Sequence, residues 1–200
     1  GVLTVLFSGF LGTLLGTMSG YLGGFTDRLV LTATEAVYAF PGILLAIFLM
    51  FLVPRPGITH IIAALCVSGW ATYARLTRGI AMSTKERPFI EAARALGLPT
   101  HRILTRHVLP QALPHVAIQA AFGIANAILA EAALSFLGLG IADGSSWGAM
   151  LSTGAVLYLK APALALAPGI VLALTVLTVL TLADSLQQRL NPKGSALFNR

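Results

Sequence analysis

Long apolar runs alternate with short polar segments along the whole chain. Each run holds about 20 residues, the length at which an α-helix crosses the hydrocarbon core of a bilayer. The pattern predicts five membrane spans, at 2–20, 29–53, 58–80, 113–137 and 162–184. We therefore expect an all-α polytopic membrane protein.

Small and aromatic residues interrupt these spans at informative positions. Gly12, Gly16 and Gly20 recur every four residues, a spacing that lets two helices pack closely in lipid. Pro41 falls within the second span and is expected to kink it or to mark a junction, because proline removes a backbone hydrogen bond. Four residues at the end of the third span are expected to anchor it at the membrane interface: Trp70, Tyr73, Arg75 and Arg78.

Composition and charge agree with a membrane protein. The chain is 56% hydrophobic and 10% charged, whereas soluble domains carry about 25% charged residues. A net charge of +6 is compatible with nucleic-acid binding, but the basic residues lie mostly between the apolar runs, as in cytoplasmic loops. From Arg75 to Arg106 there are seven basic residues against two acidic ones, so segment 81–112 is predicted to be cytoplasmic. We expect contact with membrane lipid and no nucleic-acid partner.

The remaining loops follow the same charge rule. Only Arg55 and Lys160 are clearly on the outer side, and the basic residues of the tail, Lys193 and Arg200 among them, are again cytoplasmic. Segment 138–160 is expected to be an external excursion.

Segment 81–112 is predicted to form two short helices separated by a break. On the first, Phe89, Ile90, Ala93 and Leu96 share an apolar face, and Gly97 ends the helix. Pro99 suits the first turn of the second helix. Ile103, Leu104, His107 and Val108 are expected to face one way on this second helix, and Arg102 and Arg106 another. The arrangement favours a loop that docks onto a cytoplasmic partner.

Candidate chemistry in the sequence is sparse. Cys66 has no partner for a disulfide or a cysteine metal cluster, and the four histidines show no close ligand pairing. We expect no metal site and no catalytic residue. Glu35 and Glu131 are acidic residues inside spans, a position typical of function. Each is interpreted either as path-lining or as structural: Glu35 through an interhelical hydrogen bond, Glu131 by bonding backbone freed at the break 138–140.

The loop also resembles a known sequence motif. Its pattern is Glu-Ala-Ala, three residues, Gly, nine residues, Ile, one residue, Leu-Pro. The matching residues are Glu91, Ala92, Ala93, Gly97, Leu109 and Pro110, with His107 in place of Ile. This pattern resembles the EAA loop of bacterial binding-protein-dependent ABC importer permeases. The variant at 106–110 is similar to the dipeptide, oligopeptide and nickel branch, and other matches to that branch lie at 20–24, 69–75, 130–140, 146–148 and 168–169.

The resemblance implies a type I ABC importer transmembrane fold and a permease that forms half of a translocation path. Its expected partners are a second permease subunit, two ATP-binding subunits and an extracytoplasmic substrate-binding protein, in the bacterial inner (cytoplasmic) membrane. The chain has no phosphate-binding loop of the Gly-x-x-x-x-Gly-Lys-Ser/Thr type, so it is not expected to be an enzyme. ATP and Mg²⁺ are expected in the partner subunits, and no cofactor in this chain.

The same resemblance assigns coupling roles within the loop. Gly97 would set the angle between its helices, Glu91 with Arg94 would fix it locally, and Arg102 and Arg106 would contact the ATPase. For these two arginines, membrane topology and lipid head-group contact remain an equal alternative. Implied cargoes are peptides or a related small solute, with nickel as an alternative.

Two expectations stay open at this point. Five alternating spans place residue 1 outside, whereas the resembling family has one further helix before it; truncation of the usual first span is expected, and a natural five-span relative is the alternative. A secondary transporter or a structural membrane subunit is the alternative function. The former predicts paired midplane charges and an internal repeat, and the sequence shows neither.

Overall fold

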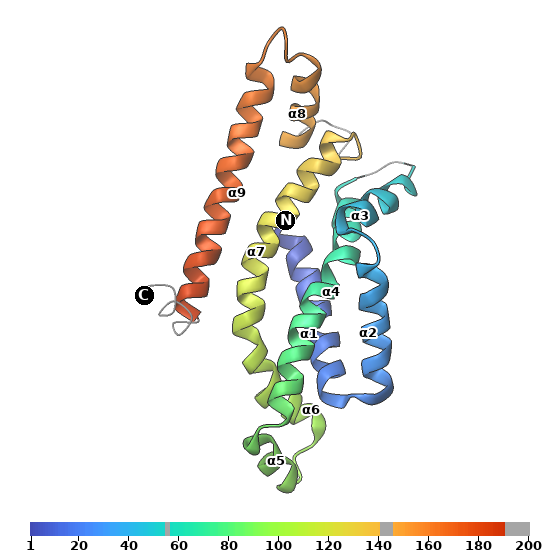
Figure 1. Cartoon of the computed structure of the whole chain (residues 1–200), viewed down its shortest axis with the longest axis vertical. Coiled ribbons are helices and arrows are strands. Elements are labelled where there is room, and N and C mark those ends of the chain that lie inside the picture. The colour runs from blue at the N-terminus through green and yellow to red at the C-terminus, as the bar shows by residue number, and fades with distance from the viewer. Residues whose placement is uncertain (55–56, 141–145, 191–200) are drawn as a thin grey trace.

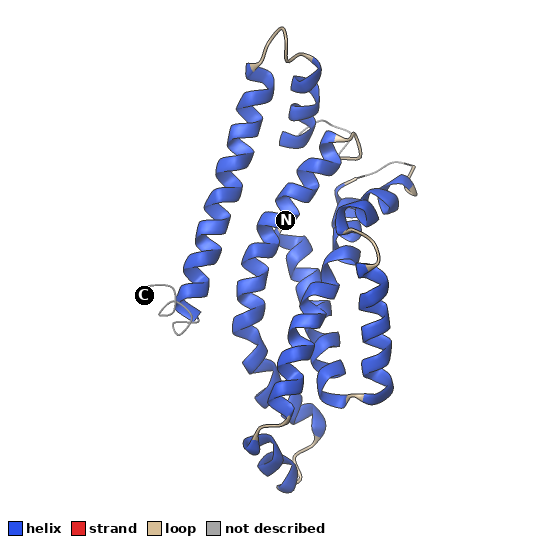
Figure 2. Ribbon diagram, viewed as in Figure 1, coloured by secondary structure: helices blue, strands red, loops and turns tan. Residues whose placement is uncertain are grey.

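The computed structural model describes residues 1–54, 57–140 and 146–190, and these are almost entirely helical, with no strand among them (Figure 2). Arg55, Lys193 and Arg200 lie outside the described residues, so the expectations for them are untested. The helices are α1 (Val2–Leu22), α2 (Gly24–Tyr38), α3 (Gly42–Phe51), α4 (Ile58–Lys85), α5 (Pro88–Ala95), α6 (Thr100–Ile103), the π-helical segment η1 (Leu104–Val108), α7 (Leu109–Phe136), α8 (Trp147–Val156) and α9 (Ala163–Leu190).

Three of the described helices are long and apolar enough to cross a membrane: Val2–Leu22, Thr100–Phe136 and Ala163–Leu190. The bent pair α2 and α3 adds a fourth if it counts as one span. Helix α4, which covers the predicted third span, is not among them, because its C-terminal half is rich in hydroxyl and basic residues. That the chain crosses the membrane five times therefore remains a prediction.

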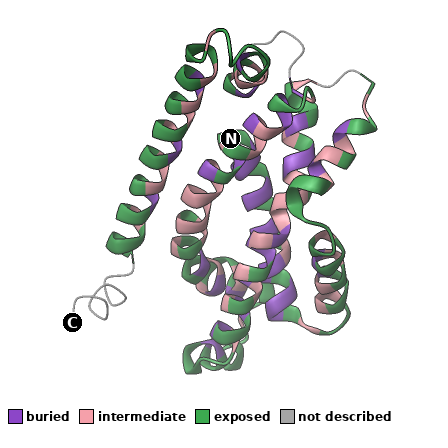
Figure 3. Ribbon diagram, turned by 45° about the horizontal axis from the view of Figure 1, so that its top comes forward, coloured by how far each residue is buried: buried purple, intermediate pink, exposed green. Residues whose placement is uncertain are grey.

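Close packing of α1 against α4 forms the centre of the molecule, where buried residues concentrate (Figure 3). A Cβ atom at Gly12, Gly16 or Gly20 would collide with backbone of α4, at the carbonyl oxygens of residues 70, 74 and 78 in turn. The glycines thus let the two helix backbones approach as the four-residue spacing predicts.

The second predicted span is broken into two helices that meet at an angle of 82°. Pro41 precedes the first residue of α3 with an extended ψ of 128°, and proline also disfavours helical geometry at the residue before it. Pro41 is therefore a junction. Helix α2 begins at Gly24, directly after α1, and the chain reverses at Gly23 and Gly24, whose φ values are +68° and +60°.

The end of the molecule at the top of Figure 1 includes α8 and the adjoining ends of α7 and α9. Helix α8 lies within the segment expected only as an excursion, with the Ser146 hydroxyl accepting a hydrogen bond from the N–H of Ala149 at its start. Gly148 approaches the backbone of α7, and Gly154 approaches the start of α9. Most of α9 is exposed along its length (Figure 3).

Candidate functional site

The predicted docking loop lies at one end of the bundle, where α5 and α6 hang below the ends of α1 and α4 (Figure 1). Pro88 begins α5 at a position where its missing N–H is harmless. The regular helix ends at Ala95, and the chain turns at Gly97, whose φ is +74°. The N–H of Leu98 donates to the carbonyl of Ala93 at 3.1 Å, and the N–H of Gly97 to that of Arg94 at 2.9 Å. These two bonds form a Schellman motif, so the predicted helix stop at Gly97 is confirmed.

An apolar cluster attaches this loop to the bundle. Ile90 and Ala93 of α5 pack with Ile103 and Val108 against the bundle, and all four are buried. Their partners are Tyr21, at the end of α1, and Ala81 of α4. The loop is therefore held by side chains on both sides of its Gly97 break.

Only part of the apolar face predicted for α5 is buried against the bundle. Ile90 and Ala93 face the cluster, but Leu96 is 80% exposed and Phe89 is 41% exposed. Leu96 follows the end of the regular helix, where the turn into Gly97 swings its side chain away from the bundle. Phe89 instead lies beside His107, with ring centroids 6.4 Å apart. The loop thus presents apolar side chains outward.

The second loop helix is the beginning of a long one. Helical residues continue from Thr100 to Phe136, and Pro99 lies just before them. The π-helical turn at Leu104–Val108 comes just before Pro110, whose ring would clash with the carbonyl four residues earlier in a regular helix. The two faces expected here are confirmed, since Ile103 and Val108 are buried whereas Arg102 and Arg106 are exposed.

Arg94 has a different partner from the one expected. Its Nε donates a hydrogen bond of 3.1 Å to the hydroxyl of Tyr21, and its guanidinium carbon lies 5.1 Å from the centre of that ring. Glu91 is exposed and forms no ion pair with Arg94. The expectation that Glu91 and Arg94 fix the loop together is therefore wrong. Arg94 reaches across to α1, whereas Glu91, one turn earlier on α5, faces solvent.

The other residues of the motif divide between surface and interior. Ala92, like Glu91, is exposed, as is Pro110, whereas His107 and Leu109 are half-buried. The motif thus presents one set of side chains outward and seats another against the bundle. Their part in docking to an ATPase remains a prediction.

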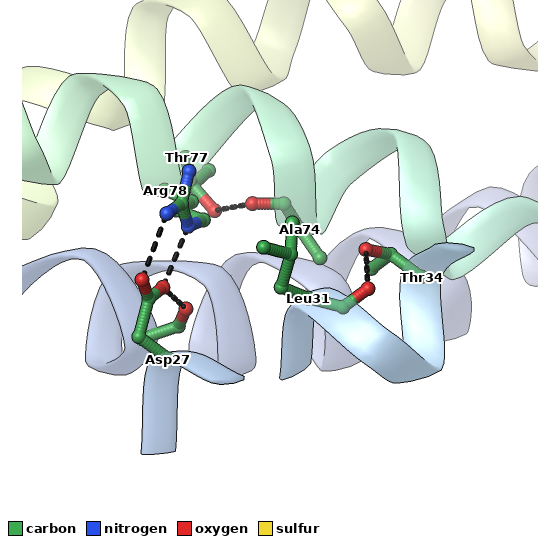
Figure 4. A network of polar contacts seen from close by, with 7 residues as sticks. Asp27, Leu31, Thr34, Ala74, Thr77 and Arg78 are labelled. Carbon is green, nitrogen blue, oxygen red and sulfur yellow. Dashed lines mark hydrogen bonds and ion pairs between the residues drawn. The ribbon is translucent and has the colours of Figure 1, made fainter. Parts of the chain in front are cut away.

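An ion pair between α2 and α4 was missed from the sequence (Figure 4). Arg78 of α4 binds Asp27 of α2 through two contacts, Nε to Oδ1 at 2.6 Å and Nη2 to Oδ2 at 2.8 Å. The Ser19 hydroxyl of α1 donates to the same carboxylate at 2.6 Å. Three helices are thereby joined at one carboxylate. The only hint of this pair in the sequence was an acidic residue in the first turn of α2 and a basic residue on α4.

Three of the four residues expected as an interfacial anchor are engaged within the molecule instead. Arg75 stacks on the ring of Tyr38 at 4.4 Å, and Arg78 binds Asp27. Tyr73 is 3% exposed and lies against glycines of α1 and α7. Its hydroxyl has no hydrogen-bond partner among the described residues. Tyr73 also lines a cavity of about 170 Å³ between α1, α4 and α7.

The two acidic residues placed inside spans lie far from the loop. Glu35 is exposed on α2 and makes no side-chain hydrogen bond with a described residue, so the expected interhelical bond is not formed. Glu131 is half-buried near the end of α7 and accepts a hydrogen bond of 2.7 Å from the hydroxyl of Ser135. The N–H groups of Gly138 and Leu139 are satisfied by backbone carbonyls rather than by Glu131. A path-lining role for either remains a prediction.

Within the part of the chain that the structure describes, no group of three histidine, cysteine or acidic side chains could hold a metal ion. Cys66 is a free, half-buried thiol. The loop presents charged and apolar side chains outward, and its buried side chains pack against the bundle.

Known proteins resemble this chain along nearly all of its length. It is 36% identical over 194 residues to the glutathione transport system permease protein GsiD of Pectobacterium atrosepticum, covering 96% of this chain and 64% of that protein. It is 37% identical to the oligopeptide transport system permease protein OppC of Haemophilus influenzae, covering 96% and 62%, and 32% identical to OppC of Bacillus subtilis, covering 96% and 63%. The chain thus spans somewhat less than two thirds of the length of these relatives.

A solved structure of the MetNI methionine ABC transporter, in an inward-facing conformation, shares the fold with a TM-score of 0.68 at 21% identity. The match covers 94% of this chain and 91% of that one. The type I ABC importer transmembrane fold expected from the motif is therefore confirmed. The family profile described as binding-protein-dependent transport system inner membrane component matches residues 12–195. The chain belongs to this family of membrane-spanning transport components.

Proposed function

We propose that the chain is the membrane-spanning permease subunit of an ATP-driven importer in a bacterial inner membrane, and that it forms half of a translocation path. Its neighbours in the complex are a second permease, two ATP-binding subunits and an external substrate-binding protein. ATP and Mg²⁺ bind in the ATP-binding subunits, and this chain contributes no catalytic group. Family membership and the permease names of the relatives support this assignment.

The observation that carries the proposal is the construction of the docking loop. Ile90, Ala93, Ile103 and Val108 anchor it in the bundle, while Leu96 and the charged side chains of Glu91, Arg102 and Arg106 project from the end of the molecule. A loop that is firmly seated yet exposes apolar surface suits the transfer of rigid-body motion from a partner to the helices above it.

The direction of that transfer follows from the contacts. A push on α5 acts on α1 through Tyr21 and Arg94, and a push on Thr100–Ile103 acts directly on α7, since the two are one continuous helix. Closure of an ATPase dimer against the loop would therefore tilt α1, α4 and α7 together.

Peptides are the proposed cargo class. Two of the relatives are named for oligopeptides and one for glutathione, which is itself a peptide. The nickel alternative draws no support from those three names. Glu35 and Glu131 remain candidates for lining the path.

A first experiment tests the docking surface in the full-length permease purified with its partner subunits. Leu96→Gln should reduce the ATPase that co-purifies, because it replaces an exposed apolar contact by a polar side chain. The matched control is Leu137→Gln, since Leu137 is 56% exposed but lies at the opposite end of α7. ATPase subunits retained by Leu96→Gln as fully as by the control would contradict docking through this surface.

A further inference from the structure

A cleft separates the docking loop from the ends of α1 and α4. It has a volume of about 420 Å³, and its lining includes Tyr21, Leu22, Lys85, Arg94 and Thr100. The floor is the ring of Tyr21, which is only 6% exposed. The cleft therefore lies where the membrane helices end and the loop begins.

Two cations converge on that floor from different elements. The ammonium of Lys85, at the end of α4, lies 6.0 Å from the centre of the Tyr21 ring, and the guanidinium of Arg94, on α5, lies 5.1 Å from it. The two like charges repel each other, and an anion between or beside them would offset that repulsion.

Among the described carboxylates, Asp27 lies near enough to attract Lys85, but its oxygens already have other partners. Neither Lys85 nor Arg94 forms an ion pair with a described residue, and the ion pair found there joins Arg78 to Asp27. The carboxylate of Asp27 is already bound by two nitrogens of Arg78 and by the hydroxyl of Ser19. A ligand from outside the chain would complete the cleft.

We propose that this cleft binds the phosphate group of an anionic phospholipid of the inner leaflet. Guanidinium and ammonium groups both bind phosphate through charge-assisted hydrogen bonds, and Thr100 lies on the same lining. A lipid, rather than free phosphate, fits because Leu22 lies at the end of a membrane-length helix, is 44% exposed and lines the cleft, which offers apolar surface beside the charges.

The bound phosphate has a mechanical consequence. Lys85 belongs to α4 and Arg94 to the docking helix, so one phosphate would hold both against α1. Anionic lipid would then stabilise the seated position of the loop. The inference goes beyond the proposed importer function and shares with it only the cytoplasmic position of this end.

The test measures lipid retention by the full-length permease in its complex, without ATP or cargo, so that its failure leaves the importer proposal untouched. Complexes are reconstituted in nanodiscs of phosphatidylcholine with or without phosphatidylglycerol, and the retained lipid is identified by native mass spectrometry. The wild type should retain phosphatidylglycerol. The double variant Lys85→Gln with Arg94→Gln should bind it about tenfold more weakly or worse, because both phosphate contacts are lost.

A matched control removes the same charge from the same end. Arg28→Gln with Arg87→Gln changes two exposed arginines that do not line the cleft, and it should retain the lipid. The single variant Lys85→Gln is a second test that should not disturb folding, since Lys85 forms no hydrogen bond with a described residue. This variant should still weaken retention of phosphatidylglycerol several-fold.

Three results would overturn the proposal. Equal lipid retention by the cleft variants and the control would show that the phosphate binds elsewhere. Binding of inorganic phosphate in place of the lipid, with the same dependence on Lys85, would assign the cleft to a soluble anion. Zero-length cross-linking of Lys85 to a carboxylate of an ATPase subunit would assign it to a protein contact.

Discussion

At the scale of single residues, the end of the molecule that carries the loop depends on polar contacts that join different helices. Asp27 binds Arg78 and Ser19, so one carboxylate connects α2, α4 and α1. Arg94 connects the docking helix to Tyr21 of α1. The basic residues here do more than orient the chain in the membrane, because two of them bind specific partners within it.

The Asp27 contacts lead to a stability prediction. Asp27→Asn should lower the free energy of unfolding by about 2 kcal/mol, because it replaces two charge-assisted hydrogen bonds of a half-buried pair by weaker neutral ones. Thermal unfolding of the purified complex in detergent measures this as a lower Tm. Arg28→Gln, one residue away but exposed, is the control.

A double-mutant cycle sharpens that test. Adding Arg78→Gln to Asp27→Asn should cost much less than Arg78→Gln costs alone, since the partner is already altered. Strictly additive losses would show that the two side chains do not stabilise each other.

At the scale of elements, glycines set how closely helices approach. The Gly12, Gly16 and Gly20 series was predicted as a packing face from spacing alone, and α4 is the helix that it meets. The break at Pro41 was likewise predicted, but its angle of 82° depends on how α3 packs against α4.

Gly16→Ala should separate α1 from α4. Its Cβ would collide with the carbonyl of Ala74 and the hydroxyl of Thr77, and overpacking of this kind costs about 1–3 kcal/mol. The measurement is the Tm of the purified permease complex. Gly79→Ala is the matched control, because a Cβ there meets nothing within 4 Å. An equal Tm for both variants would contradict the packing argument.

At the scale of the whole molecule, the docking loop and the outer end are connected by long helices. Thr100–Phe136 runs from the loop to the start of the segment that leads to α8, so displacement at one end reaches the other. Helix α9 contacts only α7 and α8 extensively, and much of its apolar surface is exposed, as expected where lipid or another subunit covers it.

Gly97 is the position where coupling should be most sensitive. Gly97→Pro should reduce cargo import per ATP hydrolysed, because proline cannot adopt a φ of +74° and has no N–H to donate to Arg94. Gly97→Asn is the control, since asparagine tolerates the left-handed region. Uptake and ATP hydrolysis are measured together in proteoliposomes. Normal import per ATP with Gly97→Pro would contradict a coupling role for this turn.

Much of this protein was readable from local pattern. The apolar runs mark the membrane helices, and the polar segment between them marks the loop. Gly97 and Pro41 interrupt helices for purely local steric reasons. The motif at 91–110 identifies the family. These features depend on residues near one another in the chain, which is why the sequence by itself determined them.

Tertiary structure alone decided which groups meet. Tyr21 lies 73 positions from Arg94 and Asp27 lies 51 from Arg78, so no periodicity could pair them. Tyr73 was assigned to an interface because aromatic residues are common there, but the approach of Gly9 and Gly123 creates a buried site that its ring fills. Leu96 lies three residues after Ala93 and shares its helical face by spacing, yet the turn at Gly97 exposes it. Whether a side chain is buried or presented to a partner depends on where distant helices pass, and only the packed bundle determines that.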